Sequence, residues 1–177
     1  PLLIGEAPSR LAPGPAFTPR PPAGARLDRL AQGRPFDAIN LLARPLGDGE
    51  EWPVSLARDR ARILYEDAFA GREVVLLGRR VARAFAALSP WTDALQGAAY
   101  FSLACPTVPA PRRTWARCML WLAPHPSSRS LWWNRPENCR QAEAFFRHVL
   151  GRLEFPGDPA LPAIIPPQDW SCLWESA

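Results

Sequence analysis

Short apolar runs alternate with amphipathic segments along most of the chain. The apolar runs carry few charges, as do strands that are buried on both faces of a parallel sheet. They predict strands at 2–5, 36–43, 73–77, 100–104 and 118–122. Between these runs, apolar residues recur at helical spacing opposite charged residues. This spacing predicts helices at 25–32, 55–69, 79–88 and 136–153.

Strands that alternate with helices predict right-handed crossovers and therefore strands that run parallel. We expect an α/β fold with three layers, α/β/α, around a mostly parallel, four-stranded central sheet. The expected domain spans 1–155, and a proline-rich tail at 156–177 is expected to lie across its surface. In the helix at 55–69, Leu56, Ile63 and Leu64 recur at helical spacing, and we expect them to form its buried face.

Polar residues follow three of the expected strands. Glu6 follows the first strand, Asn40 lies near the end of the second, and His125 follows the last. In open parallel sheets, functional groups gather at the carboxyl ends of the strands. The sequence therefore predicts that these three side chains converge from distant parts of the chain.

The composition fits one globular domain, because 47% of the 177 residues are hydrophobic and 21% are charged. No apolar run approaches the ~20 residues of a membrane-spanning helix. The first residues also lack the pattern of a signal peptide, so we expect a cytoplasmic protein without membrane contact. All 21 basic residues are arginine, which excludes a lysine Schiff base. The net charge of +4 permits nucleic-acid binding without requiring it.

Cysteine and histidine are too sparse to suggest a metal centre. Cys105, Cys118, Cys139 and Cys172 include no pair at C-x-x-C spacing, and the chain has only two histidines. We therefore expect free, reduced thiols and no bound metal.

Several motifs stand at the ends of the expected strands. They are LIGEAPSR at 3–10, AINLLARPL at 38–46, VVLLGRRVARAF at 74–85 and APHPSSRSLWWN at 123–134. Their order and spacing, with a looser G-P-A-F stretch at 14–17, resemble the uracil-DNA glycosylase superfamily over residues 1–153. The resemblance implies the fold of that superfamily. It also implies an enzyme that flips a nucleotide out of DNA and hydrolyses its N-glycosidic bond.

The resemblance also implies roles for single residues. His125 would donate a hydrogen bond to O2 of the departing pyrimidine, which stabilises the developing anion. Glu6 would position or activate the water and balance positive charge on the sugar. Asn40 would read the pyrimidine edge, and Phe17 would stack on the flipped base. The structural alternative is that these side chains only satisfy strand ends or fill loops.

DNA contacts are expected from two loops. Arg129 stands where familiar members of the superfamily insert a leucine into the gap left by the base. Leu131, Trp132 or Trp133 is expected to fill the gap instead, with one of the tryptophans anchoring the last helix. Ser127 and Ser9 are expected to hold flanking phosphates. The full set of expected DNA-contacting residues is Ser127, Ser128, Arg129, Leu131, Trp132 and the loop pair Arg112 and Arg113, which alternatively is only solvated.

The first motif bears on the substrate, since Ala7 and Ser9 are expected to line the base. Ser9 is small where the commonest members have an aromatic residue that excludes thymine. The iron–sulfur branch has an acidic residue three positions later, where this chain has Ala12. We therefore expect the pocket to admit uracil or a C5-modified pyrimidine, such as hydroxymethylcytosine or its glucosylated form. Such an enzyme would serve DNA repair or defence against phage.

The departures from the superfamily also bear on cofactors and mechanism. Because the chain lacks the ligating cysteines of the iron–sulfur branch, we expect no cluster and no other cofactor. Because lysine is absent, we expect a monofunctional glycosylase that leaves an abasic site. DNA is the expected partner, and the expected state is a monomer.

Two other functions remain open from the sequence. The first is a non-catalytic, glycosylase-like module that binds DNA or a protein through its tryptophan-rich segments. The second is an N-glycosidase that acts on free nucleosides or nucleotides. Retention of Glu6 together with His125 argues against the first, and salt-sensitive DNA binding would argue against the second.

Overall fold

A computed structural model gives the fold and describes residues 1–8, 16, 23–69, 73–88, 95, 98–104, 119–127 and 130–151. The tail expected at 156–177 lies outside these residues. The elements follow in the order β1 (Leu2–Gly5), α1 (Ala23–Ala31), β2 (Asp37–Asn40), α2 (Val54–Ala68), β3 (Glu73–Leu77), α3 (Arg79–Ala86), β4 (Leu103–Ala104), β5 (Met119–Ala123), the 3-10 helix η1 (Leu131–Asn134) and α5 (Pro136–Gly151). Each expected strand and helix therefore overlaps an observed one.

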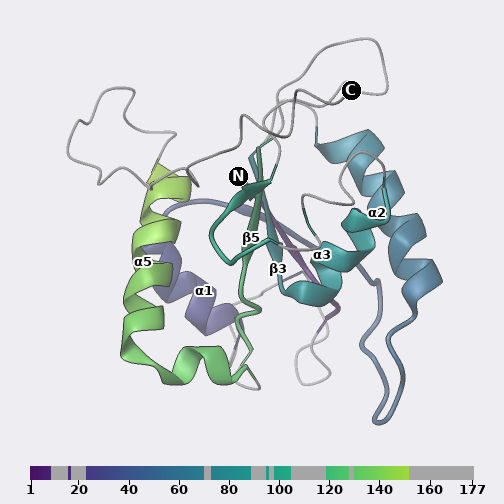
Figure 1. Ribbon diagram of the computed structural model, residues 1–177, viewed down its shortest axis with the longest axis horizontal. Coiled ribbons are helices and arrows are strands. Elements are labelled where there is room, and N and C mark those ends of the chain that lie inside the picture. Colours follow the sequence, from purple (N-terminus) through teal and green to yellow (C-terminus); the bar gives the residue numbers. More distant parts are fainter. Residues whose placement is uncertain are drawn as a thin grey trace.

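The strands form one sheet in the order β2-β1-β3-β5-β4 (Figure 1). Strands β1, β2, β3 and β5 run parallel, and β4 pairs antiparallel with β5 at one edge. Helices α1 and α5 cover one face of the sheet, and α2 and α3 cover the other. The expected α/β/α fold around a mostly parallel sheet is confirmed, and β4 adds an antiparallel edge strand.

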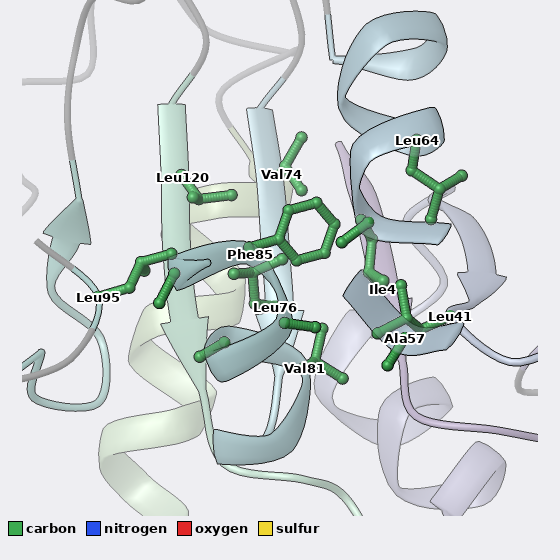
Figure 2. Packing of buried hydrophobic residues seen from close by; sticks show 14 of the residues in the cluster. Ile4, Leu41, Ala57, Leu64, Val74, Leu76, Val81, Phe85, Leu95 and Leu120 are labelled. Carbon is green, nitrogen blue, oxygen red and sulfur yellow. The ribbon is translucent and has the colours of Figure 1, made fainter. Parts of the chain in front are cut away.

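Alternate residues of each strand point to opposite faces of the sheet and so supply two cores. Toward α2 and α3, Ile4, Leu76 and Leu120 are fully buried (Figure 2). Toward α1 and α5, Leu3 and Val75 are fully buried as well. Because the strands are packed on both faces, their ends are fixed. The residues that directly follow these ends are therefore fixed in position as well.

Helix α2 is turned differently from the sequence prediction. Leu56 and Ile63 are 52% and 43% exposed, so their expected burial was wrong. The buried positions are instead Ala57, Ala61 and Leu64, which recur at spacings of four and three and therefore share one helix face. Because neighbouring residues point about 100° apart, Leu56 and Ile63 lie beside this face rather than on it. The buried face of α2 is thus formed largely by small alanines rather than by its large apolar residues.

The carboxyl ends of the parallel strands meet at one edge of the sheet. The register pairs Gly5 with Asn40 at the ends of β1 and β2. Just beyond these ends, the backbone N–H of Leu42 donates to the carbonyl of Glu6 at 2.9 Å. Strands β3 and β5 also end together, since Leu77 pairs with Ala123. Glu6, Asn40 and His125, the candidate catalytic and base-binding residues, were predicted to lie at this edge.

Candidate functional site

Glu6 is the first residue after β1, and its side chain is only 21% exposed. Its Oε2 lies 3.5 Å from Nη1 of Arg80, which comes from the first turn of α3. Strands β1 and β3 are neighbours in the sheet, so the residues that follow them lie side by side. The carboxylate is therefore partly shielded from water and faces a cation.

His125 follows β5 and is held mainly by backbone contacts. The N–H of Ser127 donates to its Nδ1 at 3.2 Å, which fixes the ring within its own loop. The indole N–H of Trp133 donates to the His125 carbonyl at 2.7 Å. Nη1 of Arg26 donates to the carbonyl of Pro126 at 2.5 Å, and its guanidinium lies 4.9 Å from the centre of the Trp133 ring. Helix α1 and η1 thus clamp the histidine loop from outside.

Gly78 lies beside both the carboxylate of Glu6 and the imidazole of His125. A Cβ at this position would stand 3.1 Å from Cβ of His125 and 3.2 Å from Oε1 of Glu6. Its φ of +102° is also a conformation that favours glycine. The N–H of Gly78 donates to the carbonyl of Ala123 at 2.8 Å, which ties the ends of β3 and β5 together. Glycine therefore lets Glu6 and His125 approach the same point.

The environment of His125 favours the neutral ring. Burial lowers its pKa below the ordinary value of 6.5; the charge of Glu6 raises the pKa, and the charge of Arg80 lowers it further. Because Nδ1 accepts a hydrogen bond, the neutral ring carries its proton on Nε2. His125 at neutral pH is therefore an uncharged donor with a fixed orientation.

Asn40 brings an unused acceptor to the same edge of the sheet. Its Oδ1 is buried and makes no hydrogen bond in the structure of the described residues. A buried polar atom without a partner typically costs about 1–3 kcal/mol, so such atoms usually serve a ligand or water. Asn40 is the last residue of β2 and pairs with Gly5, the residue that precedes Glu6. The topology therefore places Asn40 at the same edge of the sheet as Glu6 and His125.

The three residues expected to fill the gap left by the base, Leu131, Trp132 and Trp133, differ in how they pack. Leu131 is 77% exposed. Trp132 is half-buried and makes edge contacts with Tyr100 and Phe101, at ring-centre distances of 5.9 and 5.6 Å. Trp133 is buried in one cluster with residues of α5, as expected for the tryptophan that anchors the last helix. Its indole N–H also holds the histidine loop. Leu131 is therefore the most accessible of the three.

The other expected site residues divide into two groups. Ala7 is half-buried and packs against the core, and Ser127 is half-buried with its N–H bonded to His125. This leaves the hydroxyl of Ser127 as its group for a phosphate. The remaining expected residues lie outside the described part of the chain: Ser9, Phe17, Arg112, Arg113, Ser128 and Arg129.

Four residues near the candidate site were not predicted from the sequence. Arg26 contacts the histidine loop, Gly78 and Arg80 lie beside Glu6, and the Trp52 ring supports the Arg80 guanidinium at 5.8 Å. Gly78 had a usable signal, because it stands between an apolar run and a helix and thus at a strand end. The arginines had none, since 21 of them are spread along the chain and their neighbours depend on the order of strands. In the described residues, no three His, Cys, Asp or Glu side chains gather in a possible metal site.

Comparison with known proteins adds no relative. No protein-family model matches the sequence, and a search of curated proteins finds no significant match. In the part of the chain that the structure describes, no helix is both long and apolar enough to cross a membrane.

Proposed function

We propose that this chain is a monofunctional DNA glycosylase that removes uracil or a C5-modified pyrimidine and leaves an abasic site. The observation that carries the proposal is the pairing of two groups around Gly78. One is an uncharged imidazole with its proton on Nε2, and the other is the shielded carboxylate of Glu6. Hydrolysis of an N-glycosidic bond needs a donor for the leaving base and an anion beside the sugar.

Each of the two groups stabilises one of the charges that develop in the reaction, His125 the negative charge on the base and Glu6 the positive charge on the sugar. As the C1′–N bond breaks, its electron pair moves onto the pyrimidine, and Nε2–H of His125 donates to the developing negative charge. Glu6 stabilises the positive sugar and accepts a proton from the water whose oxygen bonds to C1′. A neutral donor suits this step, because it requires no protonation of the buried ring.

Asn40 supports a pyrimidine as the base. Its buried, unpartnered Oδ1 would accept a hydrogen bond from N3–H of uracil or from the 4-amino group of cytosine. The small Ser9 in the first motif favours a pocket that tolerates a C5 substituent. The proposed biological uses are therefore DNA repair and defence against phage DNA that carries modified bases.

Leu131 favours DNA over a free nucleoside as substrate. A leucine that is 77% exposed, six residues after His125, can fill the space that a flipped nucleotide leaves in the duplex. We propose that the protein acts in the cytoplasm as a monomer, and that neither a metal nor a cofactor takes part.

A panel of DNAs tests the proposal. Purified protein is incubated with single- and double-stranded uracil DNA, thymine mismatches, and DNA with hydroxymethylated or glucosylated cytosine, and abasic sites are then cleaved with alkali. We expect alkali-dependent breaks on at least one substrate and none without alkali, as a monofunctional enzyme requires. Glu6→Gln should abolish the breaks, whereas Glu51→Gln, the same change at an exposed glutamate, should not.

The same panel separates the alternatives. Binding to DNA without breaks on any substrate would overturn the proposal in favour of a non-catalytic module. Release of base from nucleosides but from none of the DNAs would favour a nucleoside N-glycosidase.

A further inference from the structure

Arg80 is held in place on two sides next to the candidate site. Its guanidinium lies 5.8 Å from the centre of the Trp52 ring and 3.5 Å from Oε2 of Glu6. Trp52 precedes α2 and packs against the core, so it provides a fixed apolar support. The Arg80 side chain is nevertheless 55% exposed. It therefore reaches the carboxylate from the solvent side, along the face of an aromatic ring.

The two carboxylate oxygens of Glu6 have different neighbours. Oε2 faces Arg80, while Oε1 lies near the position that a Cβ on Gly78 would take, and Cβ of His125 lies near that same position. A carboxylate on a short side chain can rotate freely in water, and a neighbouring cation restricts it to one orientation. The oxygen that Arg80 does not contact is the one that lies near Gly78 and His125.

We propose that Arg80 is a positioning residue that, supported by Trp52, orients the carboxylate of Glu6 and keeps a positive charge beside His125. The proposal rests on the proposed glycosylase function for its catalytic consequence only. Its geometric and electrostatic part can be tested without any substrate.

The charge of Arg80 has a defined effect on the imidazole. Among the described residues, the charged groups that face the histidine loop are Glu6 after β1, Arg80 from α3 and Arg26 from α1. Arg80 lowers the pKa of His125 and Glu6 raises it. Removal of Arg80 leaves Glu6 unopposed, so the pKa of His125 should rise and the protonated ring should persist to higher pH.

Three variants isolate this role. Arg80→Gln removes the charge, and Arg80→Lys keeps it but loses the planar fork. Arg79→Gln is the matched control, because Arg79 is the adjacent exposed arginine and instead contacts the Tyr100 ring and the carbonyl of Ala98. All three keep the core intact. A drop in DNA affinity common to both glutamine variants would reflect only the lost charge.

The first measurement is the pKa of His125, obtained by NMR titration of the ring. It does not depend on any enzymatic activity. The chain has only one other histidine, so His148→Gln assigns the signals. We expect Arg80→Gln to raise the pKa of His125, Arg80→Lys to raise it less, and Arg79→Gln to leave it unchanged. An equal pKa in the wild type and Arg80→Gln would overturn the proposal, whatever the substrate is.

The second readout is the single-turnover rate of base release at saturating DNA. We expect Arg80→Gln to lower it about 10- to 100-fold and to move its acid limb to higher pH, with Arg80→Lys between. Arg79→Gln should stay within about twofold of the wild type. An unchanged rate in Arg80→Gln would overturn the proposed role. Absence of base release in the wild type, with the NMR shifts as expected, would instead count against the glycosylase and leave the positioning geometry standing.

Discussion

The two sides of the candidate site are held in different ways. His125 is fixed by its own loop, in which the Trp133 indole donates to the His125 carbonyl and the Arg26 guanidinium donates to the carbonyl of Pro126. Among the described residues, the side chain of Glu6 has a single charged contact, to Arg80, at 3.5 Å and partly exposed to solvent. A donor to a departing anion acts best when its dipole is already aligned, because no reorganisation is then needed during the reaction. The carboxylate, by contrast, is adjusted by a neighbouring charge.

This difference predicts that substitutions on the two sides should change different properties of the protein. Changes on the histidine side should alter both stability and rate, because they break buried contacts. Changes on the glutamate side should alter the rate and its pH dependence while leaving the fold nearly intact. The following predictions run from the largest expected effect to the smallest.

Glu6→Gln should lower the rate of base release by about 10²- to 10⁴-fold, since an amide can neither accept the proton of water nor carry the balancing charge. The measurement is single-turnover release of free base. The melting temperature should change little, because the ion pair that the Glu6 carboxylate makes in the described part of the chain is with a half-exposed arginine. A large loss of stability would contradict the description of this side as adjustable.

His125→Ala should lower the same rate by about 10²- to 10³-fold, through loss of the donor to the leaving base. DNA affinity should stay near that of the wild type, so the loss should appear in the rate at saturating DNA. An effect confined to affinity would mean that His125 binds DNA and does not assist the leaving group.

Gly78→Ala should disturb both sides at once, because its Cβ would press on His125 and Glu6 at 3.1 and 3.2 Å. We expect a rate loss of about 10- to 100-fold from the displaced groups. Unfolding in urea should show a cost of about 1–3 kcal/mol for a non-glycine residue at positive φ. Gly49→Ala, at a φ of +72° with open space around it, is the control for strain without displacement.

Trp133→Phe keeps an aromatic ring but removes the N–H that holds the His125 carbonyl. The free energy of unfolding should fall by about 0.5–1.5 kcal/mol, as for one buried hydrogen bond. The rate should fall by several-fold as the histidine loop loosens. A fall in stability without any change in rate would show that this clamp does not orient the imidazole.

The pH dependence of stability should reveal the lowered pKa of the partly buried His125 imidazole. Because the pKa of His125 is lower in the folded chain than its ordinary value of 6.5, the unfolded chain binds more protons in the interval between the two. The free energy of unfolding should therefore fall as the pH drops through that interval. Urea unfolding at a series of pH values measures this loss, and His125→Ala should reduce it.

The fold was largely predictable from the sequence, and the reasons lie in particular segments. Runs such as EVVLL at β3 are apolar on both faces, which occurs only in a covered sheet. The face of α2 was not predictable by side-chain size, because Ala57 and Ala61 make its close approach. The antiparallel direction of β4 was not predictable either, since an apolar run carries no sign of strand direction.

The candidate site was predictable only in part. Glu6, Asn40 and His125 could be found because strand ends mark functional positions. Arg80 could not, because its contact with Glu6 depends on β1 and β3 being neighbours, although about 70 residues separate them in sequence. The same holds for Arg26, whose contact joins α1 to the histidine loop.

The most direct measurement follows free base by mass spectrometry, for the wild type, Glu6→Gln and His125→Ala side by side, on every DNA of the panel. All three proteins should bind DNA with similar affinity. We expect only the wild type to release base at a readily measured rate, from at least one substrate with a uracil or C5-modified pyrimidine. Base release by all three at equal rates, or by none of them despite binding, would contradict the assignment of Glu6 and His125 as the groups that break the glycosidic bond.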